Sequence, residues 1–504
     1  MIETLGPILL PTVHTDLTPG QHGVTTMIVM TPPPLFTALE VSAGDTAWVL
    51  TSASLVLLMT PALAFFYGGM VRVRSVLNML MMVVTPMATV GIGWVLVGYS
   101  MAFGRPMWGG LIGNPLEFFG LHGVLGQTVG TIPAIVFVAF QSAFAIIAVA
   151  LIAGGPADRM RFPTWVAFTC LWSLLCYFPV ANWVFGTGWI LNKVHAVDFA
   201  GGTAIHINAG AAALALVVVM GPRLGFGNQA MRPHNTTLVM LGAGVLWFGW
   251  FGFNAGSSLG ANEQAGLVWV NTLLGAGAAL LSWIAVERIR DGRPTCLGAA
   301  SGLVAGLVGI TPACAAVSPT GAIAIGVLCG VCCCLAVGLK YALGYDDSLD
   351  VVGVHLVGGL VGTLAIGLLA DPALMPEATL EAHGAGLFLG GGLGLLGAQA
   401  LGALACLAYS FVLTFVLAKA LDSTMGLRIG PADEVRGIDV AEHAEVGYDL
   451  SGIRHSALSL AHPVPDHIVI PPAPRESVPG QAPASPLSPS DAGRDARTGQ
   501  EVSS

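Results

Sequence analysis

The sequence predicts an all-α membrane protein with eleven transmembrane helices. Only 9% of the 504 residues are charged, against about 25% in soluble domains, and 55% are hydrophobic. The apolar residues gather in stretches of roughly 20, the length that a helix needs to cross a hydrocarbon core of about 30 Å. A soluble protein could not cover its surface with so few charges. The net charge of −9 also excludes a basic surface for nucleic acid.

The predicted spans follow one another without a break in the pattern. They are residues 46–68, 76–101, 131–153, 162–180, 199–220, 236–256, 266–286, 297–316, 321–341, 351–370 and 385–419. The first ten divide into five plus five, and an odd number puts the two halves in opposite orientations, as in an inverted repeat. The eleventh is long enough to project beyond the membrane.

The basic residues predict the orientation. Of the 19 Lys and Arg residues, all but Arg105 and Lys193 fall in alternate loops or after the last span. Basic residues accumulate on the cytoplasmic side of a membrane. We therefore expect the N-terminus outside the cell and the C-terminus in the cytoplasm.

The segments that flank the spans differ in composition. Residues 1–45 contain no Lys or Arg, whereas a secretory signal opens with a basic region, so we expect a poorly ordered extracytoplasmic leader. The helical domain occupies 46–420, and a polar cytoplasmic region follows over 421–455. Residues 456–504 are rich in Pro and Ser and cannot bury enough apolar area to fold, which predicts disorder.

Two histidines stand out among the twelve. Only His206 and His355 fall in the apolar part of a span, where an ionisable side chain is costly and usually faces a cavity, a partner or a pathway. Asp198 precedes the first by eight residues and Asp350 precedes the second by five. The two spans are the fifth and tenth, so an inverted repeat predicts the imidazoles side by side near the midplane. The alternatives are polar contacts between helices and, less well supported because no third ligand is suitably spaced, a metal site.

Several longer strings resemble one family. They are 65–69 (FFYGG), 198–208 (DFAGGTAIHIN), 249–257 (GWFGFNAGS), 311–314 (TPAC), 350–355 (DVVGVH), and 426–429 (GLRI) with 437–439 (GID). In this order they resemble the signatures of the ammonium transporters (the Amt/Mep/Rh superfamily), in the prokaryotic Amt branch. The resemblance runs from about residue 44 to 450. It implies a homotrimer with one pore per subunit, in the plasma membrane, with no cofactor and no enzymatic activity.

The resemblance also implies a set of site residues. Phe144 and Ser257 would bind ammonium at an external site, where the family usually adds a Trp and this chain has Phe185. Trp183 or Trp189 could partly substitute for that Trp. Asp198 would support the external end of the path without lying in it. Phe140 and Phe253 would stack as a hydrophobic gate above His206 and His355, which would relay a proton while neutral ammonia crosses.

The expected function is therefore transport of ammonium and methylammonium into the cytoplasm. An ammonium sensor that conducts little stays open as the alternative, since the external aromatic residue is changed; a Rh-like gas channel fits less well. Region 421–455 resembles the part of the family that binds a trimeric PII-type signalling protein. Its usual His-Gly-Glu is here His443-Ala444-Glu445.

Overall fold

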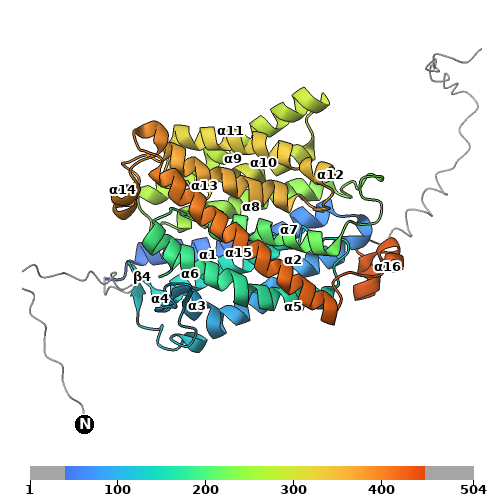
Figure 1. The fold of residues 1–504 in the computed structure, drawn as a ribbon, viewed down its shortest axis with the longest axis horizontal. Coiled ribbons are helices and arrows are strands. Elements are labelled where there is room, and N and C mark those ends of the chain that lie inside the picture. The colour runs from blue at the N-terminus through green and yellow to red at the C-terminus, as the bar shows by residue number, and fades with distance from the viewer. Residues whose placement is uncertain (1–39, 449–504) are drawn as a thin grey trace, which may run out of the picture. The chain divides into compact units, whose positions relative to one another are not determined.

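The structure is a computed structural model that describes residues 40–448 (Figure 1). The predicted tail 456–504 and residues 1–39 of the predicted leader lie outside the described residues. The last three residues of that leader already belong to the first helix, which begins at Ala43 because the Ser42 side chain accepts a hydrogen bond from the Asp45 N–H.

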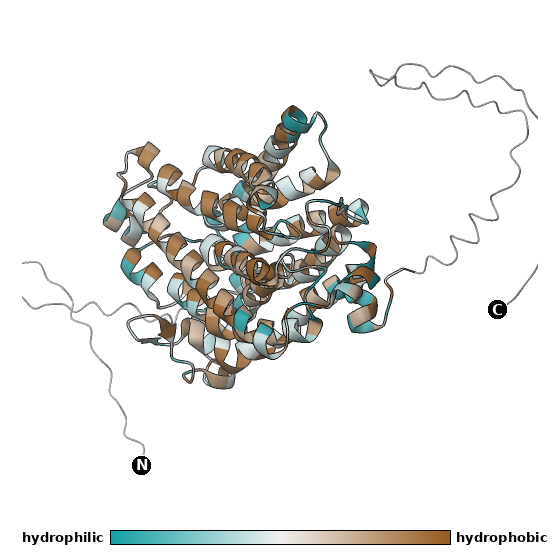
Figure 2. Ribbon diagram, turned by 45° about the vertical axis from the view of Figure 1, so that its right-hand side comes forward, coloured by the Kyte–Doolittle hydropathy of each residue, from teal (hydrophilic) through white to brown (hydrophobic). Residues whose placement is uncertain are grey.

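Ten helical segments among the described residues are long and apolar enough to cross a bilayer. They are α1 (Ala43–Met70); Val73–Phe103, made of η1 (Val73–Ser75), α2 (Val76–Gly93), η2 (Trp94–Gly98) and α3 (Tyr99–Phe103); α4 (Ala134–Ile152); Phe162–Val194, made of α5 (Phe162–Trp172), η4 (Ser173–Tyr177), α6 (Phe178–Phe185) and η5 (Ile190–Val194); η6 (Gly202–Ile207) with α7 (Asn208–Met220); α8 (Thr236–Gly256); α9 (Glu263–Asp291); α11 (Pro319–Ala336) with α12 (Leu339–Leu343); η7 (Val352–Leu356) with α13 (Val357–Leu369); and α15 (Gly394–Thr424). Hydrophobic residues dominate these helices in Figure 2.

The predicted span 297–316 is shorter than expected. Its helix, α10 (Cys296–Ile310), has 15 residues, or about 22 Å of helix, which falls short of a hydrocarbon core of about 30 Å. The helix ends where Thr311 and Pro312 begin a series of turns, because Pro cannot donate the next helical hydrogen bond. Ten of the eleven predicted spans are thus full-length apolar helices among the described residues, and α10 is a shorter apolar helix at the place of the remaining one.

The predicted start of the last span is nine residues too early. Residues 385–393 form turns around η8 (Leu387–Leu389), since glycines such as Gly390, with φ +91°, favour loop conformations there. The remaining elements are short. They are β1 (Pro106–Met107) paired with β2 (Ile112–Gly113), η3 (Phe119–Leu121), β3 (Thr128–Val129) paired with β4 (Ile132–Pro133), α14 (Glu377–His383), α16 (Pro431–Arg436) and η9 (Asp439–His443).

The helices of the fifth and tenth predicted spans are continuous but irregular at their starts. Both open with π-helical turns, η6 and η7, and the chain is non-helical shortly before them, at Gly201 and at Asp350, whose φ is +63°. From these turns α7 and α13 continue for 13 residues each, about 20 Å. The helix α15 contacts both of them as it crosses diagonally in Figure 1. Irregular backbone at membrane depth is tolerated where it is buried in protein or lines a cavity, so these turns mark the place to look for a site.

Candidate functional site

The two histidines from the π-helical turns face each other. His206 lies in η6 and His355 in η7, and both side chains are buried. Their Nδ1 atoms are 3.2 Å apart, and the rings lie nearly parallel at 18° with centroids 5.3 Å apart. A hydrogen bond between two Nδ1 atoms needs one protonated and one bare nitrogen, so the pair shares one proton at this contact.

An aromatic ring covers one face of the His206 imidazole. Trp250 of α8 stacks on the imidazole at 5.4 Å and 17°, and its indole N–H donates to Thr311 Oγ1 at 2.9 Å. The Nε2 atom of His206 has no hydrogen-bond partner within the described part of the chain. This nitrogen is thus available to a substrate. At the sequence level Trp250 appears only within the string 249–257, without a role at the site, because a Trp in an apolar span is usually a packing residue.

Asp198 holds the turn that carries His206. Its carboxylate accepts hydrogen bonds from four consecutive backbone N–H groups, those of Gly201, Gly202, Thr203 and Ala204, at 2.7–3.0 Å. These are the unpaired donors at the start of a helix, where negative charge is stabilised. Desolvation raises the pKa of this carboxyl, and the four donors oppose that effect. Asp198 precedes the helix rather than lying on it, and it lines no described cavity.

The matching residue in the second half is Asp347 and not Asp350. Asp347 precedes His355 by eight residues, as Asp198 precedes His206, and its Oδ2 accepts from the Val352 N–H at 2.7 Å. Asp350 instead pairs with Lys340 at 2.5 Å. Of the two acidic residues before His355, Asp347 therefore occupies the position equivalent to Asp198, and the Asp350 noted in the sequence does not.

A narrow cavity reaches the histidine pair. This histidine cavity has a volume of only about 10 Å³. Apart from the two histidines its lining is apolar or aromatic: Met59, Leu63, Phe66, Ile147, Leu151, Leu246, Trp250, Phe253 and Val304. Such a lining offers a cation almost no oxygen atoms, so it disfavours charged species and admits small neutral ones.

A second, wider cavity is lined mainly by phenylalanines. This aromatic cavity has a volume of about 220 Å³ and is lined by Val129, Phe137, Phe140, Gln141, Phe144, Phe185, Phe199, Ala200, Ser257 and Leu259. It brings together three of the four predicted external-site residues, Phe144, Phe185 and Ser257. The Ser257 hydroxyl donates to the Phe253 carbonyl at 2.9 Å, which leaves its oxygen lone pairs free to accept.

The stacked phenylalanine pair differs from the expected one. Phe144 stacks on Phe253 with centroids 4.4 Å apart and planes at 21°. Phe140 meets Phe144 edge to face at 4.7 Å and lines only the aromatic cavity. The expected stack of Phe140 on Phe253 was therefore wrong, because Phe144 lies one helical turn further along α4 and occupies that position. Since Phe144 lines one cavity and Phe253 the other, this pair stands between the two.

The two tryptophans considered as substitutes for the missing Trp lie elsewhere. Trp183 donates its indole N–H to the Leu111 carbonyl at 2.8 Å and packs against Tyr409 and Trp189. Trp183 and Trp189 line neither the aromatic nor the histidine cavity. Phe185 is thus the aromatic residue that this stretch contributes to the aromatic cavity.

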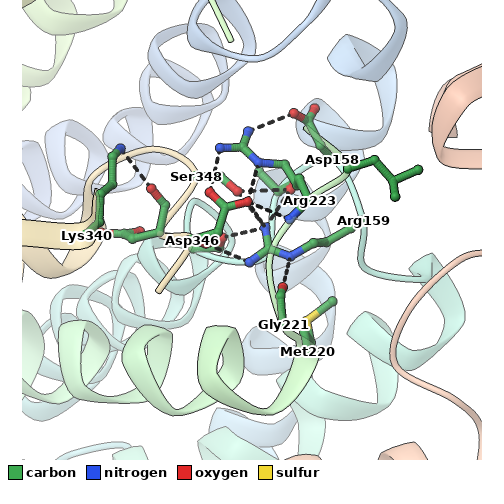
Figure 3. A network of polar contacts seen from close by, with 12 residues as sticks. Asp158, Arg159, Met220, Gly221, Arg223, Lys340, Asp346 and Ser348 are labelled. Atoms are coloured by element: carbon green, nitrogen blue, oxygen red, sulfur yellow. Dashed lines mark hydrogen bonds and ion pairs between the residues drawn. The ribbon is translucent and has the colours of Figure 1, made fainter. Parts of the chain in front are cut away.

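A buried arginine network closes the opposite end of α7 (Figure 3). Arg223 pairs with Asp158 at 3.0 Å and with Asp346 at 2.8 Å, and Arg72 also pairs with Asp158 at 3.1 Å. Arg159 donates to the Gly221 and Asp346 carbonyls. Although burial opposes ionisation, Arg223 and Arg72 lower the pKa of Asp158. The network ties the chain ends of α1, α4 and α7 to the loop before η7.

The region after α15 docks onto this end through acidic side chains. Asp439 accepts from the Leu77 and Asn78 N–H groups, at 3.1 and 2.8 Å, and so caps α2. Glu442 caps α5 by accepting from the Phe162 N–H at 3.1 Å. The cap residues of these helices supply no such bond themselves. The described part of the predicted region 421–455, up to residue 448, is therefore held by helix termini.

Within residues 40–448, no group of three or more His, Cys, Asp or Glu side chains could hold a metal ion.

Comparisons with known proteins agree with one another. The sequence profile of the Ammonium Transporter Family matches residues 47–448. The ammonium transporter of Mycobacterium bovis is 55% identical over 440 residues, which cover 82% of this chain and 92% of the relative. The crystal structure of Saccharomyces cerevisiae Mep2 is 33% identical with a TM-score of 0.72, over 78% of this chain and 88% of Mep2. A structure described as Sensor Amt Protein is 29% identical with a TM-score of 0.73, over 79% of this chain and 98% of its own.

Proposed function

The chain belongs to the ammonium transporter family and is a multi-pass protein of the plasma membrane, and on this premise we propose that it carries ammonium and methylammonium into the cytoplasm. The observation that carries the proposal is the order of three features: the aromatic cavity, the Phe144–Phe253 pair and the histidine pair. The first suits a cation, and the last two suit only a neutral molecule. We infer that the cation loses a proton between them.

Recruitment would take place in the aromatic cavity. The faces of Phe144 and Phe185 attract a cation by up to about 2 kcal/mol when it is desolvated, and Ser257 supplies an acceptor oxygen. Asp198 would act from behind the cavity, through the turn that it holds and through its negative charge. Burying the intact cation further in would cost far more than these contacts return.

Deprotonation and relay would follow at the histidines. The N–H bond of ammonium breaks, its electron pair stays on nitrogen, and Nε2 of His206 accepts the proton. The Nδ1 proton of His206 passes to Nδ1 of His355, and Nε2 of His355 releases its own proton on the other side. Neutral ammonia crosses beside the pair. An imidazole suits this role because one nitrogen can accept while the other donates.

Orientation and assembly complete the proposal. We place the aromatic cavity outside and the arginine network in the cytoplasm, in keeping with the positive-inside rule. In this arrangement α10 and the turns after it fill the place of the predicted eighth span, 297–316. The chain would form a homotrimer, and a PII-type protein would bind the cytoplasmic face near region 421–455.

A sensor is the second candidate. The narrow histidine cavity and the similarity to a protein described as Sensor Amt Protein favour it. A sensor binds ammonium in the aromatic cavity but conducts little, so conduction separates the two functions.

The test is an electrical recording on proteoliposomes that receive an inward ammonium gradient. The transporter predicts an ammonium-dependent current and uptake; their absence in correctly inserted protein would contradict transport and favour the sensor. Replacing both His206 and His355 with Ala should change current and selectivity, whereas His122→Ala, in an exposed loop, should not. Unchanged current and selectivity in the double variant would reject the relay.

A further inference from the structure

One polar residue in the aromatic cavity has no assigned role. Four residues of α4 line this cavity and lie three, one and three residues apart: Phe137, Phe140, Gln141 and Phe144. This spacing puts them on one face of the helix. Gln141 therefore interrupts a stripe that is otherwise aromatic.

The amide of Gln141 has an unsatisfied hydrogen-bonding capacity. Within α4 only Gln141 and Ser142 are polar, and the Ser142 hydroxyl is satisfied by the Ala139 carbonyl at 2.7 Å. No residue in 40–448 forms a hydrogen bond with the Gln141 side chain. A polar side chain in a membrane span is costly and commonly marks a functional position, so packing alone does not explain this amide.

The composition of the cavity limits what it can bind. Gln141 and Ser257 are the polar side chains among its ten lining residues, and no carboxylate is among them. An ammonium ion that sheds water there needs acceptors for its N–H groups. Ser257 supplies one oxygen, and the amide oxygen of Gln141 supplies another, while aromatic faces take the remaining positive charge.

We propose that Gln141 is the second hydrogen-bond acceptor for the recruited cation and favours ammonium over K⁺ at this site. The inference rests on the proposed function, since it assigns a specificity residue to the same cavity. The reason for selectivity is geometric. Ammonium forms directional hydrogen bonds and gains fully from two well-placed acceptors, whereas K⁺ must replace a shell of several oxygens, which two acceptors cannot do.

Methylammonium provides an internal check. It keeps three N–H donors, so it can use both acceptors while its methyl group packs on a phenylalanine. Gln141 should therefore matter about equally for ammonium and methylammonium.

The experiment measures currents in proteoliposomes across a range of ammonium and methylammonium concentrations. Gln141→Leu should raise the half-saturating concentration of both ions about tenfold, because the bound cation loses one hydrogen bond from its charged donor. The maximal current should stay within about twofold, because that bond is made in the recruitment step and not during passage past the histidines. Gln141→Glu keeps an acceptor and adds a charge. It should lower the half-saturating concentration and let K⁺ compete. Ser142→Ala, on the adjacent position and outside the cavity lining, is the matched control and should behave as wild type.

The outcomes separate the two levels of the proposal. A wild-type current with unchanged half-saturation in Gln141→Leu would overturn the role of Gln141 and leave transport standing. No wild-type current would reject transport, and the variants are then compared by the thermal stabilisation that ammonium chloride gives over potassium chloride. Equal stabilisation of wild type and Gln141→Leu would again overturn the role. If Gln141→Leu does not fold, Gln141→Met, which also lacks an acceptor oxygen, takes its place.

Discussion

The two aspartates at matching positions should respond very differently to the same substitution. Asp198 and Asp347 each precede a pore histidine by eight residues, and each holds the turn that carries it. The carboxylate of Asp198 accepts four backbone N–H bonds, whereas that of Asp347 has one, from Val352, at Oδ2, and its Oδ1 is unpaired within the described residues. Asn in place of either residue keeps the size and offers only one acceptor oxygen.

The contacts set the expected magnitude. In Asp198→Asn the new NH₂ group faces N–H donors, so at least two of the four bonds are lost. Hydrogen bonds to charged groups contribute about 1.5–3 kcal/mol each. Burial raises the pKa of Asp198, so the cost of burying its charge offsets part of what these hydrogen bonds contribute. We therefore take the lower value, about 1.5 kcal/mol, for each of the two lost bonds, which gives about 3 kcal/mol in total. With an unfolding entropy of about 2.1 cal/mol/K per residue over roughly 400 residues, the unfolding midpoint should fall by about 3–4 °C.

The assay compares thermal unfolding in detergent with ammonium current in proteoliposomes. Asp198→Asn should lower the midpoint by this amount and remove most of the current, because η6 positions His206. Asp347→Asn should not lower the midpoint at pH 7.5, since its amide oxygen can still accept from the Val352 N–H and the variant removes a buried carboxylate whose pKa is raised. Equal midpoints for the two variants, or a wild-type current in Asp198→Asn, would refute the reasoning.

Three further predictions concern single positions. Phe185→Trp should lower the half-saturating ammonium concentration about threefold, because an indole face binds cations better than a phenyl face; a rise in dose–response recordings would show that the indole overfills the cavity. Burial, together with Asp350 and against Lys340, raises the pKa of Asp347 to about 6. The contribution of Asp347 to the stability of the wild type is thus present below pH 4 and is lost as pH rises through 6. Because Asn does not titrate, the unfolding midpoint of Asp347→Asn relative to wild type should increase from pH 5 to pH 7.5. A difference that stays constant with pH would contradict this. Asp439→Asn should weaken the cap on α2 by about 1 kcal/mol and speed proteolysis of region 421–448, with Glu445→Gln, whose side chain makes no ion pair among the described residues, as the unchanged control.

Much of the fold could be predicted because membrane spans obey one strong rule. Apolar length located nearly every helix, and the cost of an ionisable group in a bilayer pointed to His206 and His355. The errors fall where the backbone leaves regular helix. The end of α10 at Thr311 and the late start of α15 at Gly394 depend on turns that hydropathy does not register.

Part of the site could be predicted and part could not. Phe144, Phe185 and Ser257 meet in one cavity although they come from separate helices, as the family resemblance implied. The partner of Phe253 was misassigned because Phe140 and Phe144 lie on the same helical face, and only side-chain packing distinguishes two phenylalanines one turn apart. Gln141 could have been found from the sequence, as a polar residue within an aromatic stripe of a span.

The inequality of the two aspartates also bears on the direction of function. At the aromatic end, the Asp198 carboxylate is balanced by four N–H dipoles and forms no ion pair within residues 40–448, so the field there favours a cation in the adjoining cavity. At the other end, Asp347 and Asp350 lie beside Lys340, which cancels one negative charge, and the raised pKa of Asp347 lets a proton cancel the second. A repeat that places two similar histidine turns back to back can thus still distinguish its two ends. The aromatic end attracts the cation, whereas the end with Asp347 and Asp350 has little net charge with which to retain a cation.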